Sequence, residues 1–225
     1  MNGRRIILAL DVENFSKAKR FVNLLYPKIK IFKVGLQLFI ASGPKIVEFI
    51  RQKGAEVFLD LKFFDIPNTV ANATRQAVRL KVKMLTLHVS GGEEMLRAAA
   101  KAAAEESSRL KIKSPLLIGV TVLTSQKASS EEVLRLAKFG LSCGLDGVVC
   151  SAQEARNLRS KIKKKFIMVT PGIRPDKTIR DDQKRTATIA EALRSGSDFL
   201  VIGRPILEAK NPLQVVAEQC SVTAN

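Results

Sequence analysis

Two charged residues stand inside an otherwise apolar stretch, in the segment FLDLKFFDIPNTV from Phe58 to Val70. Asp60 and Lys62 are two residues apart, and Asp65 follows three residues later. If the stretch is a strand, its alternation places the Asp60 and Lys62 side chains on the same face. Because an unpaired buried charge is costly, both residues need partners.

Candidate partners for this pair stand in the two preceding apolar runs. Lys33 lies in IFKVGL, and Asp11 ends RIILALD. If neighbouring strands bring them together, Asp11, Lys33, Asp60 and Lys62 form a network of alternating charge that neutralises itself. The alternative is an ion-pair plug that only closes a core. Buried ion pairs are often no more stabilising than apolar packing, so stability alone does not account for the four charges.

Eight apolar runs, each followed by a helical pattern, predict eight strand-then-helix units. The expected strands are Arg5–Asp11, Ile31–Leu36, Glu56–Lys62, Met84–Val89, Leu116–Leu123, Gly147–Ser151, Phe166–Gly172 and Phe199–Ile206. Continuous apolar runs are typical of parallel strands that helices cover. Without a linker or low-complexity segment, the pattern predicts one (β/α)₈ barrel domain over residues 1–225. A doubly wound sheet is the alternative, but LDVENFS lacks the glycine-rich phosphate fingerprint of that fold.

The expected helices carry start and stop signals. Asn14, Ser129 and Asn211 offer side-chain oxygens near the first turns of three helices, and Gly54 and Gly144 stand where two helices should end. The helices are expected at Ser16–Tyr26, Pro44–Lys53, Asn68–Leu80, Glu93–Leu110, Ser130–Gly140, Ala152–Lys163, around Asp182–Ser195, and at Pro212–Gln219.

In barrels of this type the active site lies at the carboxyl ends of the strands. Polar residues gather at those ends in this chain: Asp11, Lys33, Asp60, Lys62, His88, Thr121, Thr124, Ser151, Thr170, Arg174 and Arg204. His88 is the only histidine, and the surrounding TLHVSGG supplies no carboxylate that could complete a metal site with it. We therefore interpret His88 as a structural histidine and predict no metal.

A second group of motifs comes late in the chain. TPGIRPD follows the seventh expected strand, RDDQKR comes next, and VIGRPI ends the eighth strand. Barrels often bind phosphate with the loops after strands seven and eight. Gly203 lets main-chain N–H groups approach an anion closely, and Arg204 adds a cation. The alternative is a pair of ordinary turns with surface arginines.

Composition excludes several classes of protein. The 225 residues are 46% hydrophobic, which is enough for a sizeable core. No apolar run approaches the roughly 18 residues of a membrane span, and Asp11 and Glu13 interrupt the N-terminal apolar stretch that a signal peptide needs. The three cysteines, at positions 143, 150 and 220, lack metal-ligand spacing and fit a reducing cytoplasm.

The net charge is +17 and the sequence pI is about 10.1, a balance that can indicate nucleic-acid binding. Here the basic residues are spread along the chain, and we interpret the densest run, RSKIKKKF, as a solvated helix end. A nucleic-acid-binding module is the alternative, but it should carry aromatic stacking platforms. The chain has no Trp and 5% aromatic residues, so we predict no nucleic-acid partner; the cations can instead steer a phosphorylated substrate.

Taken together, these motifs resemble one known family closely. The run DLKFFDIPNT, from Asp60 to Thr69, resembles the D-x-K-x-x-D-I-P-x-T signature of orotidine 5'-phosphate decarboxylases. The resemblance extends over essentially the whole chain through LALD, FKVGL, HVSGG, TVLTS, PGIRP, DDQKR and VIGRPI, in the family's order. It implies a (β/α)₈ barrel that acts as a homodimer and converts orotidine 5'-monophosphate to UMP and CO₂, without cofactor or metal, at the end of pyrimidine synthesis.

The resemblance also implies a role for individual residues. Lys62 would protonate the pyrimidine carbon that loses CO₂, and Asp60 would lie beside the departing carboxylate. Asp11 and Lys33 would bind ribose hydroxyls. Asp65, Ile66 and Thr69 would also contact substrate, and Asp65 and Thr69 would do so by reaching into the partner subunit's site. Thr124 would meet the pyrimidine. The phosphate would be bound by Gln183, Gly203 and Arg204, and Arg174 would lie in the loop that closes over it.

A related enzyme class competes with this interpretation. Sugar-phosphate decarboxylases and aldolases of the same suprafamily use a similar D-x-K-x-x-D strand with Mg²⁺, and they usually place an extra acid near the metal. FFDIPNTV and DDQKR favour the nucleotide. One departure from the family pattern is the absence of a proline in RTATIAEALRSG, which we expect to affect helix geometry alone.

Overall fold

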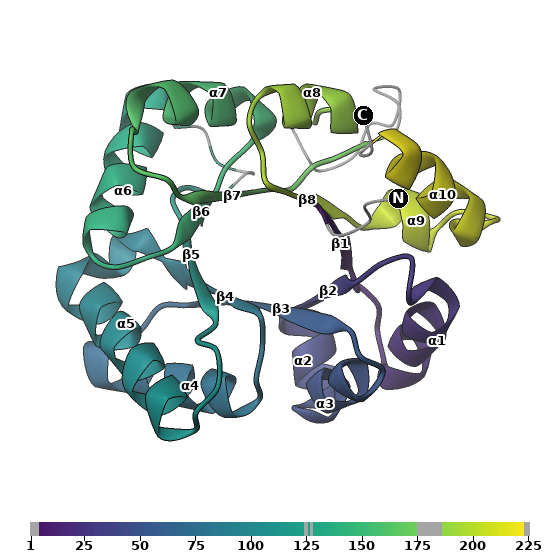
Figure 1. Ribbon diagram of the computed structural model, residues 1–225, viewed down its shortest axis with the longest axis horizontal. Helices are drawn as coiled ribbons and strands as arrows, with labels where there is room; N and C mark the ends of the chain where they lie inside the picture. Colours follow the sequence, from purple (N-terminus) through teal and green to yellow (C-terminus); the bar gives the residue numbers. More distant parts are fainter. Residues whose placement is uncertain (1–4, 124–125, 127, 175–185, 223–225) are drawn as a thin grey trace.

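The eight strands form a closed parallel barrel in the computed structural model, which describes residues 5–123, 126, 128–174 and 186–222 (Figure 1). Around the barrel they run in chain order: β1 Ile6–Ala9, β2 Ile31–Gly35, β3 Glu56–Phe63, β4 Met84–His88, β5 Leu116–Val120, β6 Gly147–Val149, β7 Ile167–Thr170 and β8 Phe199–Ile202. Strand β8 pairs in parallel with β1, which closes the ring. The predicted (β/α)₈ barrel is confirmed.

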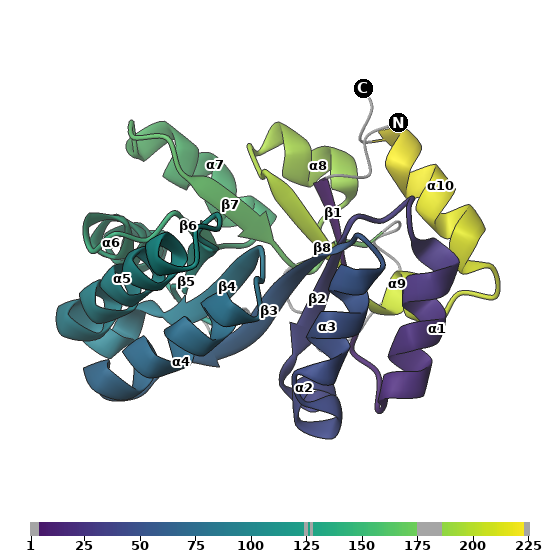
Figure 2. The same ribbon diagram turned by 60° about the horizontal axis from the view of Figure 1, so that its bottom comes forward.

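Helices follow the strands and surround the barrel (Figure 1). They are α1 Phe15–Leu25, α2 Leu36–Ser42, α3 Lys45–Gln52, α4 Pro67–Arg79, α5 Gly92–Arg109, α6 Ser130–Ser142, α7 Ala152–Lys161, α8 Ile189–Arg194, α9 Arg204–Leu207 and α10 Pro212–Val222, with a 3₁₀ turn at Val89–Gly91. The first and last long helices, α1 and α10, contact each other, as Figure 2 shows from the side. No helix among the described residues combines the length and hydropathy needed to cross a membrane.

Several predicted boundaries were wrong because short helices begin where strands were expected to continue. Strand β2 ends at Gly35 and α2 starts at Leu36, and β8 ends at Ile202 before α9. Within the described part of the helix expected around Asp182–Ser195, the helix runs over Ile189–Arg194, and Thr188 and Glu191 form a capping box at its start. Residues 175–185, which include the start of that expected helix, lie outside the described residues.

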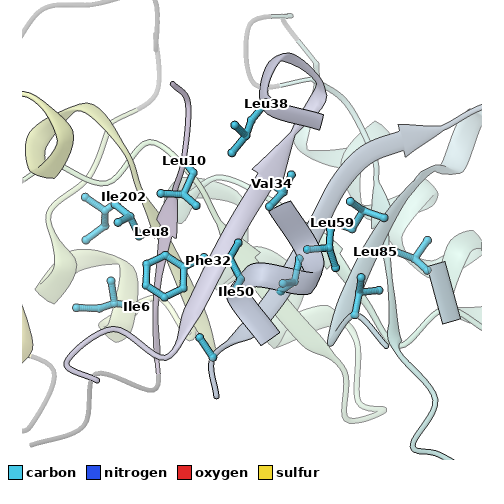
Figure 3. Packing of buried hydrophobic residues seen from close by; sticks show 14 of the residues in the cluster. Ile6, Leu8, Leu10, Phe32, Val34, Leu38, Ile50, Leu59, Leu85 and Ile202 are labelled. Carbon is cyan, nitrogen blue, oxygen red and sulfur yellow. The ribbon is translucent and has the colours of Figure 1, made fainter. Parts of the chain in front are cut away.

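Each strand buries side chains on both of its faces. The outward face packs under the helices and includes Ile6, Leu8, Phe32, Leu59 and Leu85 (Figure 3). The inward face fills the interior of the barrel with Ile7, Ile31, Phe58, Met84, Ile118, Val169 and Val201. This double burial explains why the strands read as continuous apolar runs. The apolar interior also forms the floor beneath the polar carboxyl ends of the strands.

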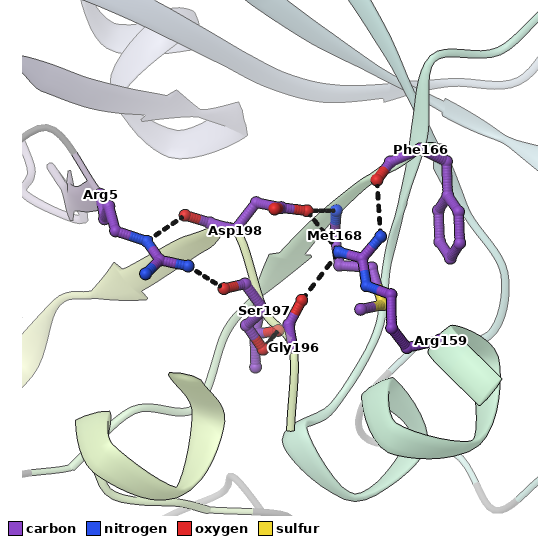
Figure 4. A network of polar contacts seen from close by, with 8 residues as sticks. Arg5, Arg159, Phe166, Met168, Gly196, Ser197 and Asp198 are labelled. Atoms are coloured by element: carbon purple, nitrogen blue, oxygen red, sulfur yellow. Dashed lines mark hydrogen bonds and ion pairs between the residues drawn. The ribbon is translucent and has the colours of Figure 1, made fainter. Parts of the chain in front are cut away.

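A polar network secures the amino-terminal end of the barrel near β7 and β8 (Figure 4). The Asp198 carboxylate accepts hydrogen bonds from the Met168 main-chain N–H at 2.8 Å and from Arg159 at 2.7 Å. Arg159 also donates to the carbonyls of Phe166 and Gly196. Asp146, which precedes β6, has the same role toward β5, where its carboxylate accepts from the Leu117 N–H. In both cases, the aspartate that precedes one strand accepts a hydrogen bond from the main chain of the strand before it.

Replacing Asp198 with alanine is expected to lower the free energy of unfolding by about 2 kcal/mol, because a main-chain N–H and a guanidinium lose their acceptor. Urea denaturation followed by circular dichroism measures the change. The control Glu13→Ala removes an exposed ion pair with Lys17 and should leave the denaturation midpoint unchanged. Equal midpoints for Asp198→Ala and the wild type would show that the network does not stabilise the barrel.

Candidate active site

The four charged residues singled out in the sequence meet at the carboxyl ends of β1, β2 and β3. Lys33 Nζ lies 2.9 Å from Asp11 Oδ1 and 3.5 Å from Asp60 Oδ2. Lys62 Nζ lies 2.9 Å from Asp60 Oδ1. The order Asp11, Lys33, Asp60, Lys62 therefore forms a chain of alternating charge, as the spacing predicted. The inner members are well buried, with side-chain exposures of 11% for Lys33 and 13% for Asp60.

The charges of this network reinforce one another. Burial disfavours the carboxylate of Asp60, but the charges of Lys33 and Lys62 outweigh burial and hold the pKa of Asp60 below its usual value. Burial likewise disfavours the ammonium of Lys33, yet Asp60 and Asp11 raise the pKa of Lys33 above its usual value. Both groups are therefore ionised at neutral pH, which preserves the alternating pattern.

Lys62 departs from regular strand geometry. Its φ of 51° lies in the left-handed region, which is uncommon for a residue other than glycine. The β3–β4 ladder also shifts register between Leu59 and Phe63. Strain of this kind costs on the order of 1–3 kcal/mol and persists where the surroundings impose it. Strand alternation alone therefore does not account for the contact between Lys62 and Asp60. The left-handed backbone of Lys62 and the register shift also determine where the Lys62 side chain lies.

Thr86 belongs to the site and is missing from the residues predicted from the sequence. Its Oγ1 accepts a hydrogen bond from the Lys62 main-chain N–H at 2.8 Å and lies 3.0 Å from Asp60 Oδ1. A signal was present, because Thr86 alternates with Met84 and His88 along β4 and so faces the barrel interior. The prediction named only polar residues at the strand ends, and Thr86 lies one layer deeper.

The network forms one side of a cavity of about 260 Å³. The side chains of Val120, Val149, Val169 and Val201 add an apolar wall. Arg174 and Arg204, with Gly203, line the same cavity and supply two cations. An anionic ligand with an apolar portion suits such a lining.

Two glycines lie beside the charged network, and they differ in how closely their neighbours approach. A Cβ on Gly35 would come within 3.0 Å of Lys33 Nζ, so a larger residue there would press on the ammonium. A Cβ on Gly203 would lie 3.4 Å from the Ala9 Cβ and 3.6 Å from Asp11 Oδ2. The glycine of FKVGL therefore leaves space for the Lys33 ammonium, whereas a Cβ on Gly203 would make only ordinary van der Waals contacts.

Asp65, Ile66 and Thr69 do not line this cavity. All three are exposed, and Asp65 Oδ1 accepts a hydrogen bond from the main-chain N–H of Ile66. Asp65 and Ile66 line a separate open hollow, which they share with Phe64 and with Arg97 on α5. The prediction that Asp65 and Thr69 reach a partner subunit stays a prediction.

Other polar strand ends serve the fold. The Thr121 hydroxyl donates to the Val149 carbonyl, Ser151 caps α7, and Thr170 shares a hydrogen bond of 2.7 Å with Ser197. The expectation that these ends join one polar ring around the site was therefore wrong for Ser151 and Thr170, which are buried in structural contacts. Thr124 and Gln183 fall outside the described residues.

His88 lies beside the network at the end of β4. Burial and the charge of Lys62 lower the pKa of His88, so the imidazole is neutral at neutral pH. Its ring packs against Phe64, with ring centroids 5.5 Å apart. Within residues 5–123, 126, 128–174 and 186–222, no three His, Cys, Asp or Glu side chains are grouped as a metal site would require.

Comparison with known proteins agrees with this geometry. A model of the orotidine 5'-phosphate decarboxylase / HUMPS family matches residues 4–219. The orotidine 5'-phosphate decarboxylase of Moorella thermoacetica is 46% identical over 221 residues, which cover 93% of this chain and 88% of that protein. The enzyme of the same name from Neisseria meningitidis serogroup C is 47% identical, over 95% of this chain and 89% of that protein.

Solved structures show the same relationship. The crystal structure of orotidine 5'-phosphate decarboxylase from Lactobacillus acidophilus matches with a TM-score of 0.86 and 33% identity, over 98% of this chain and 99% of that one. The Pyrococcus horikoshii structure of that name, at 21% identity and a TM-score of 0.80, shares the fold. Because the matches span nearly the whole sequence, the chain belongs to the orotidine 5'-phosphate decarboxylase / HUMPS family.

Proposed function

We propose that this chain decarboxylates orotidine 5'-monophosphate to UMP and CO₂, the last step of UMP synthesis. The observation that carries the proposal is the chain of alternating charge that ends at Lys62 Nζ inside the cavity. The activity named for the relatives, together with the apolar wall and the arginines of the same cavity, supports it. The reaction as proposed uses neither metal nor organic cofactor.

The chemistry follows from the residue types. When the bond between the pyrimidine ring and its carboxylate breaks, the electron pair stays on the ring carbon and CO₂ leaves. The ammonium of Lys62, held 2.9 Å from Asp60, stabilises that negative charge and then donates its proton to the same carbon. Solvent returns a proton to the Lys62 amine before the next turnover.

Asp60 is proposed to lie beside the substrate carboxylate. It is held there in its charged form by Lys33 and Lys62, so it does not become a proton source itself. Because Asp60, Lys33 and Lys62 are positioned before substrate arrives, they need little reorganisation during the reaction. We expect this preorganisation to lower the activation free energy more than repulsion between Asp60 and the substrate carboxylate does.

The rest of the substrate is proposed to span the cavity. Asp11 and Lys33 would bind the ribose hydroxyls, and Thr124 would meet the pyrimidine. The phosphate would lie against Arg204, Gln183 and the main chain of Gly203, with Arg174 beside it. Binding the phosphate far from the reacting carbon offsets the cost of orienting the base.

We also propose that the chain works as a homodimer. Exposed apolar side chains gather at the carboxyl ends of β2 and β3, where Leu36, Ile40, Phe64 and Ile66 are 55%, 82%, 61% and 67% exposed. An exposed apolar patch of this kind suits a protein interface. It flanks Asp65, so a second copy docked there can receive Asp65 and Thr69 into its own site.

The single-domain organisation and the cytoplasmic location stay predictions.

Replacing Arg204 with alanine should weaken binding of the nucleotide substrate roughly 10- to 100-fold, because a charged hydrogen bond to phosphate is lost. Binding of the nucleoside orotidine, which has no phosphate, should stay unchanged. Isothermal titration of both ligands into the inactive Lys62→Ala protein, with and without the Arg204→Ala change, measures this, and Arg194→Ala at the end of α8 in the same background controls for lost charge. Equal losses for nucleotide and nucleoside would remove Arg204 from the phosphate site.

Product analysis tests the proposed function. Purified protein is incubated with orotidine 5'-monophosphate, and in parallel with a β-keto sugar-phosphate acid and Mg²⁺, and products are identified by mass spectrometry. We expect UMP and CO₂ from the first reaction and no product from the second. Turnover of the sugar phosphate alone would replace the proposed substrate while keeping the phosphate site.

A further inference from the structure

Thr86 lies behind the charged network rather than in the cavity. It is 1% exposed, and it does not line the cavity that Asp60 and Lys62 face. Its Oγ1 nevertheless contacts both of these residues, at 2.8 Å from the Lys62 main-chain nitrogen and 3.0 Å from Asp60 Oδ1. One buried hydroxyl therefore joins the backbone of one charged residue to the side chain of the other.

The direction of these two hydrogen bonds is determined by chemistry. The main-chain N–H of Lys62 can only donate, so the Thr86 oxygen accepts from it. The Asp60 carboxylate is ionised and can only accept, so the Thr86 hydroxyl donates to Asp60 Oδ1. That carboxylate oxygen also accepts from Lys62 Nζ at 2.9 Å. Thr86 thus closes a ring of contacts between the backbone and the side chain of Lys62.

The backbone of Lys62 needs such a partner. Its left-handed φ of 51° coincides with the register shift between Leu59 and Phe63 on the edge that faces β4. The regular main-chain ladder is interrupted there, and the Thr86 side chain takes the place of a β4 carbonyl as acceptor. The same contact holds the strained conformation in place.

We propose that Thr86 is a positioning residue, whose hydroxyl fixes the Asp60 carboxylate and the strained Lys62 backbone relative to each other. The inference rests on the proposed decarboxylation, because its effect on rate requires that Lys62 and Asp60 act on substrate. Thr86 itself touches no substrate. Without its hydroxyl, the Lys62 N–H and Asp60 Oδ1 each lose one partner, and the ammonium is no longer held at one place.

Two pairs of variants isolate the hydroxyl. Thr86→Val keeps the shape and removes the hydroxyl, whereas Thr86→Ser keeps the hydroxyl. Thr86→Ala, compared with Thr86→Ser, differs by one oxygen and serves if the valine variant does not fold. Thr74→Val is the matched control, because Thr74 is a buried threonine on α4 whose hydroxyl has no hydrogen-bond partner among the described residues.

The kinetic expectation separates positioning from folding. Thr86→Val should lower kcat roughly 10- to 100-fold, because small misplacement of reacting groups is costly, while KM changes by less than about threefold. Thr86→Ser and Thr74→Val should retain kcat within about threefold of the wild type. Unchanged kcat in Thr86→Val, or an equal loss in Thr86→Ser and Thr86→Val, would overturn the inference.

A second readout does not require turnover. The groups that face Asp60 are Lys33 from β2, Lys62 from β3, His88 from β4 and, through Lys33, Asp11 after β1. The Thr86 hydrogen bond contributes to the lowered pKa of Asp60, so removing it should raise that pKa. Carbon-13 NMR of the Asp60 carboxyl follows the titration in the wild type and in Thr86→Val.

The two readouts distinguish failure of the inference from failure of the proposed function. If the wild type does not decarboxylate orotidine 5'-monophosphate, the proposed function fails, and the NMR titration alone decides on Thr86. An upward shift of the Asp60 pKa in Thr86→Val then supports the positioning contact. The same titration curve in both proteins would contradict it.

Discussion

Replacing Lys62 with alanine is expected to abolish decarboxylation, with kcat reduced by at least about 10⁴-fold, since one ammonium supplies both the electrostatic stabilisation and the proton. The fold should survive, because the Lys62 side chain is 32% exposed and its contact with Asp60 is polar rather than a piece of the apolar core. Formation of UMP under single-turnover conditions measures the rate, and thermal unfolding followed by circular dichroism checks the fold.

A matched variant controls for the loss of a lysine. Lys83→Ala removes an ammonium that pairs with Glu56 near the starts of β3 and β4, at the other end of the barrel. It should leave kcat unchanged. If folded Lys62→Ala protein retains a tenth of the wild-type rate, Lys62 is not the proton donor.

Mixing two inactive variants is expected to restore activity. If the proposed dimer builds each site from Lys62 of one subunit and Asp65 of the other, then Lys62→Ala and Asp65→Ala homodimers each carry two defective sites. A mixed dimer carries one site with both defects and one intact site. Random reassortment of equal amounts should therefore give about a quarter of the wild-type activity.

A pair of variants from the same subunit's site provides the control. Lys33 and Lys62 both contact Asp60 within one chain. Mixing Lys33→Ala with Lys62→Ala should therefore restore no activity, because every site in the mixed dimer keeps one defect. Failure of the Asp65 mixture to recover, under conditions where size-exclusion chromatography shows mixed dimers, would place Asp65 outside the partner's site.

Much of the fold could be predicted because its signals are local. Buried parallel strands read as continuous apolar runs, and the caps at Asn14 and Ser129 and the positive-φ glycines Gly54 and Gly144 mark helix ends as expected. The short helix α2 was missed because it is brief and continues an apolar run directly from β2. Local patterns cannot separate a strand from a short helix in such a run.

The charged residues of the site could be predicted from the sequence. Buried ions are rare, so Asp60 and Lys62 inside an apolar strand required partners, and Lys33 and Asp11 were the ionic candidates at neighbouring strand ends. Thr86 is different, because a threonine in a strand is ordinary. Its importance comes from the register of β4 against an irregular stretch of β3, which no single-strand pattern encodes. The roles predicted for Asp65 and Thr69 depend on a second copy of the chain.

The most direct test of the central claim is the loss of orotidine 5'-monophosphate ultraviolet absorbance in the presence of purified protein, with and without EDTA. The charge network and its cavity predict fast conversion to UMP at the same rate in both samples. Absence of turnover, or turnover that EDTA removes, would contradict the proposed reaction and would direct attention to sugar-phosphate acids with Mg²⁺.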